Sequence, residues 1–268
     1  MPAILPAALL LVLALGASAP LRAAETGAAA DTRAAAEATM PAEAAAAQAT
    51  APVSTIAAPV READGAIKPG WLARHEEYVA RAKAGEVGLL FLGDSLTYGW
   101  NSVPELWQRE FGQWSPANFG IGGDRTQNLL WRITHGELAG IHPRVVVLLI
   151  GTNNIGDESA NVAAGVAAVV GAVRSALPES RILLLGLFPR GTSYWDGGRR
   201  ITRNANTLIA KLHDGVHVHY LDLTDRFVQP DQTLLKTQFP DNLHPSPAGY
   251  QIWADAMRPL LTTLLAKP

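Results

Sequence analysis

The chain is organised around residues 89–100, which read Leu-Leu-Phe-Leu-Gly-Asp-Ser-Leu-Thr-Tyr-Gly-Trp. The four apolar residues at the start are typical of a buried strand in a parallel sheet, which is apolar on both faces. Gly93 permits a sharp turn, so that Ser95 leaves the carboxyl end of this strand. If a helix begins there, its first free N–H groups lie beside the hydroxyl and favour negative charge. The alternative interpretation is that Asp94 and Ser95 only cap this helix.

Apolar runs and helical periodicity alternate along the rest of the chain. The apolar runs predict strands over residues 89–92, 117–123, 144–150, 181–187 and 218–223. Helical spacing predicts helices over residues 71–84, 104–111, 124–133, 162–177, 200–212 and 246–265. Parallel strands need right-handed helical crossovers, which predicts a three-layer α/β sandwich with a five-stranded parallel sheet in flavodoxin-like order. Strand one then lies between strands two and three, so the loops that follow these strands are neighbours.

The N-terminal region differs in composition from the rest of the chain. Residues 1–24 hold an apolar segment followed by small residues, the layout of a secretory signal peptide, although no lysine or arginine precedes Arg22. Residues 25–60 are rich in alanine and poor in large apolar residues, which predicts a flexible linker. We therefore expect one folded domain over residues 61–268. We also expect export to the periplasm or the medium, and no membrane span in the mature chain.

Charge and cysteine content exclude several kinds of site. A net charge of −2 over 268 residues gives no reason to expect nucleic acid as a partner. The chain has no cysteine, which excludes disulfides, thiolate catalysis and cysteine-based zinc sites. His217 and His219 alternate on a predicted strand, but no third ligand of suitable spacing accompanies them. We therefore expect neither a metal nor a cofactor.

A serine hydroxyl becomes a good nucleophile when a base removes its proton, and the base needs a third group to orient its ring. His244 lies in Phe-Pro-Asp-Asn-Leu-His-Pro, residues 239–245, a loop held by two prolines just before the final helix. Asp241, three residues ahead, can fold back to the imidazole. Asp222 and Asp225, near the end of the fifth strand, are competing carboxylates that spacing alone does not exclude.

Acyl transfer also needs hydrogen-bond donors for the oxyanion of its tetrahedral intermediate. Gly123 offers a backbone N–H after the second strand, and Asn153 offers a side-chain amide after the third. Each has a structural alternative, Gly122-Gly123 as a turn and Asn153 as a loop cap. Because four separate segments converge on one edge of the predicted sheet, the catalytic interpretation is favoured over four independent structural ones.

These blocks resemble those of the SGNH, or GDSL-type, hydrolases. They read Gly-Asp-Ser-Leu at 93–96, Asn-Phe-Gly-Ile-Gly-Gly-Asp at 118–124, Gly-Thr-Asn-Asn at 151–154 and Asp-Asn-Leu-His at 241–244. The resemblance implies Ser95 as nucleophile, His244 as base and Asp241 as the orienting acid. It also implies that the N–H of Ser95, together with Gly123 and Asn153, binds the oxyanion. Other stretches, such as residues 186–191, resemble the catalytic subunits of type Ib platelet-activating factor acetylhydrolases, and the dimers of that branch imply a homodimer.

The sequence thus predicts a serine esterase that removes short acyl groups, acetyl first, through an acyl-enzyme. The leader and linker have no counterpart in that cytosolic branch, so an acetylated carbohydrate stands beside an acetyl-phospholipid as the substrate. Trp100, Tyr194 and Trp195 are candidates for stacking on sugars, while Leu96 and Leu243 are candidates for the walls of a small acyl pocket. The alternative for each of the five is an ordinary packing residue, and for any one of the aromatic residues packing is favoured. The alternative from another class is a catalytically silent ligand-binding module with the same fold.

Overall fold

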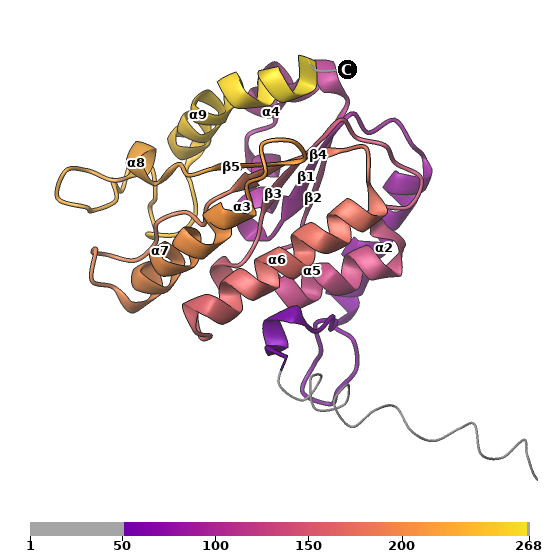
Figure 1. Cartoon of the computed structure of the whole chain (residues 1–268), viewed down its shortest axis with the longest axis horizontal. Coiled ribbons are helices and arrows are strands. Elements are labelled where there is room, and N and C mark those ends of the chain that lie inside the picture. The colour runs from indigo at the N-terminus through magenta and orange to yellow at the C-terminus, as the bar shows by residue number, and fades with distance from the viewer. Residues whose placement is uncertain (1–50, 267–268) are drawn as a thin grey trace, which may run out of the picture. The chain divides into compact units, whose positions relative to one another are not determined.

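The computed structural model describes residues 51–266 (Figure 1). The signal peptide predicted over 1–24 and most of the linker predicted over 25–60 lie outside the described residues. Five parallel strands form one sheet in the order β2-β1-β3-β4-β5. Their bounds are β1 Leu89–Gly93, β2 Pro116–Gly120, β3 Val145–Leu149, β4 Arg181–Leu185 and β5 Val218–Leu221. This confirms the predicted five-stranded parallel sheet and its flavodoxin-like order.

Helices cover both faces of the sheet, which confirms the three-layer α/β sandwich. Figure 1 shows α4 (Pro104–Phe111) and α9 (Pro247–Ala266) on one face. The other face carries α2 (Pro69–Lys83), α5 (Thr126–Arg132), α6 (Ser159–Ala176) and α7 (Gly197–Ile209). The shorter turns are η1 Val53–Thr55, α3 Ser95–Tyr98, η2 Gly99–Ser102, η3 Gly112–Trp114, η4 Ile133–Glu137, η5 Thr152–Asn154, η6 Ala210–Leu212 and α8 Thr224–Phe227.

The register of the sheet places three loops side by side. Gly93, the last residue of β1, pairs with Gly120 of β2 on one side and with Leu149 of β3 on the other. The chain therefore leaves all three strands at the same edge. Ser95, the glycine pair 122–123 and Asn153 follow these three strand ends within a few residues, as the strand order predicts.

Trp100 is a buried core residue, so its predicted role in stacking on sugars is wrong. The turn η2 continues directly from α3 and carries the indole inward, where it is 0 % exposed. Its ring lies 4.7 Å from that of Tyr250, 5.2 Å from that of Trp253 and 5.2 Å from that of Phe111, measured between centroids. This aromatic cluster fastens α4 and α9 to the same face of the sheet.

The described end of the predicted linker is packed against the domain. Ser54 is 1 % exposed, its hydroxyl donates to the carbonyl of Asn161 at 2.6 Å, and its own carbonyl accepts from the Thr126 hydroxyl at 2.7 Å. The Ala58 N–H donates to the Gln127 carbonyl at 3.0 Å. Residues 53–58 therefore belong to the folded unit rather than to a tether, because α5 and α6 satisfy their polar groups.

Helix α6 is, among the described helices, the one that is long and apolar enough to cross a bilayer. Its valines at 162, 166, 169 and 173 recur at helical spacing and are each no more than 1 % exposed. That stripe is buried in the core of the domain, where it packs between α5 and α7. The apolar character of α6 is thus explained by its position within this fold.

Gly93→Ala tests how tightly the strand ends are packed. An added Cβ would lie 2.2 Å from the Leu149 carbonyl oxygen and 2.3 Å from the Thr97 hydroxyl, so the strand or the turn must shift. We expect the free energy of unfolding, measured in urea, to fall by about 1–3 kcal/mol. The control is Gly171→Ala in α6, where an added Cβ meets nothing within 4 Å and alanine favours the helix. A loss for Gly171→Ala as large as that for Gly93→Ala would contradict the packing argument.

Candidate active site

Three side chains from distant parts of the sequence meet at the carboxyl edge of the sheet. The Ser95 Oγ lies 3.0 Å from Nε2 of His244, and Nδ1 of His244 lies 2.6 Å from Oδ2 of Asp241. Both contacts are within hydrogen-bond distance, in the order hydroxyl, imidazole, carboxylate. Such a chain can withdraw a proton from the hydroxyl and stabilise the imidazolium that forms.

Local hydrogen bonds fold the loop of residues 239–245 around Asp241. Besides the imidazole, its carboxylate accepts from the N–H groups of Leu243 at 2.9 Å and His244 at 2.7 Å. Partial burial raises the pKa of Asp241, but the hydrogen bonds from the His244 ring and from the two N–H groups outweigh burial and lower the pKa to about 2. The carboxylate is therefore ionised at neutral pH, as a group that orients a base must be.

Ser95 stands at the first position of α3, immediately after β1. Asp94 caps this turn, since its Oδ1 accepts from the Leu96 N–H at 2.9 Å. The first N–H groups of a helix have no partner within the helix, so the Ser95 N–H is available as a donor beside its own hydroxyl. The capping interpretation of Asp94 is thus correct, and it is compatible with a reactive role for the half-buried Ser95.

The two other candidate donors, Gly123 and Asn153, lie on the loops that flank Ser95. A Cβ built on Gly122 would lie 3.9 Å from Cβ of Ser95, so the glycine pair passes close to the nucleophile. Gly123 has φ +83°, in the left-handed region of backbone conformation that favours glycine. The Asn153 amide donates one hydrogen to the Asp124 carbonyl at 2.8 Å, which fixes its orientation and leaves the second hydrogen to donate elsewhere.

Beneath this rim lies a buried charge network that sequence reasoning missed. Arg132 is 0 % exposed and donates to the carbonyls of Phe119 at 3.0 Å and Gly93 at 3.1 Å, the residues at the ends of β2 and β1. Its Nε lies 2.8 Å from Oδ2 of Asp124, and it also forms an ion pair with Glu137. A lone arginine in the otherwise apolar run of residues 129–133 was the available signal, because a buried charge requires partners.

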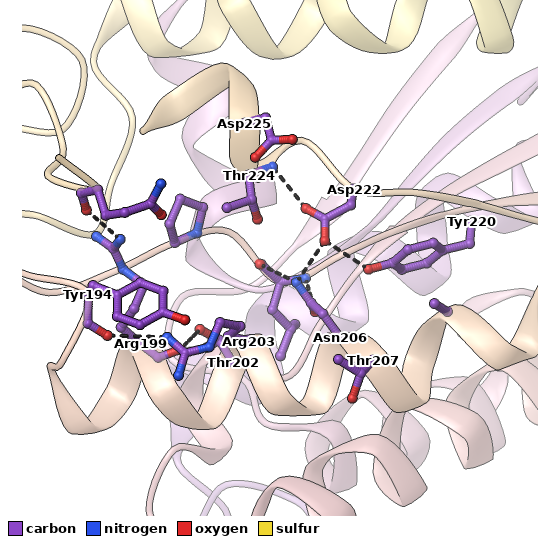
Figure 2. A pocket seen from close by; sticks show the side chains of 14 residues that line it. Tyr194, Arg199, Thr202, Arg203, Asn206, Thr207, Tyr220, Asp222, Thr224 and Asp225 are labelled. Atoms are coloured by element: carbon purple, nitrogen blue, oxygen red, sulfur yellow. Dashed lines mark hydrogen bonds between the residues drawn. The ribbon is translucent and has the colours of Figure 1, made fainter. Parts of the chain in front are cut away.

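The competing carboxylates, Asp222 and Asp225, line a separate cavity of about 390 Å³ between α7 and the end of β5 (Figure 2). Asp222 accepts from the Thr224 N–H at 2.8 Å, the Tyr220 hydroxyl at 3.2 Å and the Asn206 amide at 3.4 Å. These groups occupy its oxygens, whereas Asp241 holds the ring of His244. The geometry therefore selects Asp241 as the partner of the histidine.

The described residues contain no group of three histidine, cysteine, aspartate or glutamate side chains placed to hold a metal ion. His219 is largely buried, with Nε2 3.3 Å from the Val216 carbonyl oxygen, and its ring lies 5.8 Å from that of His213 between centroids. His219, on β5, is thus part of the packing at that end of the sheet, whereas His217 precedes the strand and is exposed.

Asp94→Asn should change how stability depends on pH. Complete burial raises the pKa of Asp94 to about 7, and its second oxygen has no hydrogen-bond partner within residues 51–266. Because an aspartate of the unfolded chain titrates near its ordinary pKa of 3.8, the folded protein holds an extra proton between about pH 4 and 7. The stability that this proton gives is complete below pH 4 and is lost as the pH rises through 7.

Asparagine keeps the oxygen that caps α3 and carries no charge. We therefore expect the Tm of Asp94→Asn, relative to the parent, to increase steadily from pH 4 to pH 8 in melts followed by circular dichroism. The matched control is Asp64→Asn, because the exposed Asp64 also caps an N–H two residues on, that of Ala66, at 2.9 Å. A Tm difference for Asp94→Asn that stays constant over this range would show that Asp94 is already ionised at pH 4.

Residues 91–252 match the model of the GDSL-like lipase/acylhydrolase family. The chain is 38 % identical over 210 residues to the platelet-activating factor acetylhydrolase IB subunit alpha1 of Homo sapiens, covering 78 % of this chain and 89 % of that protein. It is 33 % identical over 195 residues to the alpha2 subunit of Gallus gallus, covering 73 % of this chain and 85 % of that protein.

Solved structures share the fold. A GDSL-like lipase from Bacteroides thetaiotaomicron superimposes with a TM-score of 0.58 at 17 % identity, covering 71 % of this chain and 98 % of that one. Axe2, an acetylxylan esterase from Geobacillus stearothermophilus, gives a TM-score of 0.53 at 20 % identity, covering 68 % of this chain and 97 % of that one. From the family match and the identity to the curated relatives, the chain belongs to the GDSL-like lipase/acylhydrolase family and is an ester hydrolase.

Proposed function

We propose that this enzyme removes acetyl and other short acyl groups from an alcohol through a Ser95-His244-Asp241 triad. The observation that carries the proposal is the unbroken chain of contacts, 3.0 Å from Ser95 Oγ to His244 Nε2 and 2.6 Å from His244 Nδ1 to Asp241 Oδ2. A binding module that had lost catalysis would have no need to keep three such groups aligned, so the geometry favours the enzyme.

The proposed reaction proceeds in two steps. His244 takes the proton of the Ser95 hydroxyl while Oγ attacks the ester carbonyl carbon, and the carbonyl oxygen becomes the oxyanion. The N–H groups of Ser95 and Gly123 and the free hydrogen of the Asn153 amide donate to that oxygen. The intermediate collapses as His244 passes its proton to the departing alcohol. Water then attacks the acyl-enzyme in the same way and releases acetate and Ser95.

For the alcohol portion we propose a carbohydrate. Axe2 is an acetylxylan esterase and shares the fold, while the curated relatives are platelet-activating factor acetylhydrolase subunits. Trp195 is 82 % exposed beside Tyr194, and the same loop donates a hydrogen bond from the Gly191 N–H to the Asn242 carbonyl at 2.9 Å. An aromatic surface is thus connected to the loop of the proposed base, and the predicted export also favours a carbohydrate.

Ser95→Ala should lower kcat for p-nitrophenyl acetate by at least about a thousandfold with an unchanged Tm, because it removes the nucleophile and little else. The matched control is Ser102→Ala, an exposed serine in the following turn whose hydroxyl bonds only the Gly99 carbonyl. A fluorophosphonate probe should label the parent and Ser102→Ala but not Ser95→Ala. Hydrolysis by Ser95→Ala at the parent's rate would show that Ser95 is not the nucleophile. A parent that neither hydrolyses the ester nor reacts with the probe would be a catalytically silent binding module.

The rate of acetate release from different acetyl esters distinguishes a carbohydrate substrate from a phospholipid substrate. We expect acetylated xylan or acetylated amino sugars to release acetate at least about tenfold faster than an acetyl-phospholipid presented in mixed micelles, at equal ester concentration. The physical reason is that an exposed tryptophan stacks on a sugar ring with its polar edge in water. The opposite order of rates would assign the enzyme to phospholipid substrates.

A further inference from the structure

A cavity of about 350 Å³ lies directly beside the candidate oxyanion loop. One wall is formed by Gly122 and Gly123, and another by Tyr98, the last residue of the turn that Ser95 begins. A third wall is the start of α2, with Lys68 just before the helix and Arg74 in its second turn. Gly122, which lines the cavity, also passes close to Ser95, since a Cβ built on it would lie 3.9 Å from Cβ of Ser95. The cavity is therefore within reach of a substrate whose ester lies at Ser95.

The wall at the start of α2, which contains Lys68 and Arg74 and is called the cationic wall below, carries positive charge. Lys68 is exposed, and no carboxylate within residues 51–266 lies at ion-pair distance from its ammonium group. The guanidinium of Arg74 lies over the ring of Tyr98, 5.6 Å from its centroid, and is shared with Glu77 at 2.7 Å on the outer side of the helix. Two cations against one carboxylate leave the cavity electropositive at its mouth.

Helix α2 is fixed rigidly with respect to the nucleophile. The Trp71 indole donates to Oδ1 of Asp124 at 2.6 Å, and the Tyr78 hydroxyl donates to the Gly120 carbonyl at 2.7 Å. Both acceptors belong to the end of β2 or the loop after it, which also contains Gly122 and Gly123. The cationic wall is therefore held in place before any ligand binds, which lowers the entropic cost of using it.

We propose that the sugar that forms the alcohol portion of the substrate also carries an anionic group, a carboxylate or a phosphate, that binds in this cavity between Lys68 and Arg74. The inference rests on the proposed function: an acetyl group has no charge, so the anion belongs to the alcohol. Such a group accepts hydrogen bonds from the ammonium and the guanidinium while its ester carbonyl lies at Ser95.

The test uses three esters of matched shape: phenyl acetate, which is neutral, 4-acetoxybenzoate and 4-acetoxyphenyl phosphate. For the double variant Lys68→Ala/Arg74→Ala we expect KM to rise about fivefold to tenfold for the charged esters, with phenyl acetate unchanged within twofold. Lys68→Glu should raise KM for the charged esters more than Lys68→Ala does. In the parent, KM should be lower for the charged esters than for phenyl acetate, and added salt should remove this difference. The charged ester with the larger rise identifies the anion as carboxylate or phosphate.

The matched control is Lys83→Glu, at the other end of the same helix and exposed, which should leave all three KM values unchanged. Equal effects of the double variant on neutral and charged esters, or an equal effect of Lys83→Glu, would overturn the inference. A parent that does not hydrolyse phenyl acetate would instead count against the proposed function, so the two failures are distinguishable. Melting curves of each variant establish that it is folded.

Discussion

The geometry of the site depends on the buried guanidinium of Arg132. It donates to the last carbonyl of β1 and to the carbonyl of Phe119 near the end of β2, and it pairs with Asp124 and Glu137. A charge with no access to water is tolerated only when its hydrogen bonds are satisfied, and removing one partner of such a pair costs about 3–5 kcal/mol. The strand ends that lead to Ser95 and to the glycine pair 122–123 are thus held at a fixed separation by one side chain.

Asp124 extends this restraint to the other parts of the rim. Burial raises the pKa of its carboxyl to about 6, although Arg132 and the Trp71 indole favour the charged form and keep the shift from being larger. Its carboxylate holds α2 through Trp71, and its backbone carbonyl orients the Asn153 amide. The third loop and the cationic wall are therefore positioned relative to the same buried charge, which explains how segments so far apart in sequence keep a common geometry.

Patterns that depend on local periodicity were predictable from the sequence, whereas contacts made by single side chains were not. The run of valines and leucines at 145–149 allows little but a buried strand, and the strand order followed from the crossovers. The direction of Trp100 depends on one 3₁₀ turn, and the packing of Ser54 depends on partners more than seventy residues away. Hydropathy averages do not contain such information. The partners of Ser95 could be predicted because their chemistry is demanding, although spacing alone left three carboxylates open.

The two halves of the site are held by different kinds of interaction. Ser95 and its candidate donors follow strand ends that the buried Arg132 network fixes. His244 and Asp241 lie instead on a loop whose hydrogen bonds are mostly local, and their side chains are 44 % and 54 % exposed, respectively. Exposed hydrogen bonds open at lower free energy than buried ones. The loop of the base is therefore the part of the site that can yield to a bulky alcohol, while the rigid half maintains the geometry around the carbonyl. This division suits the proposed reaction, in which a small acyl group is placed accurately while the alcohol portion varies in size.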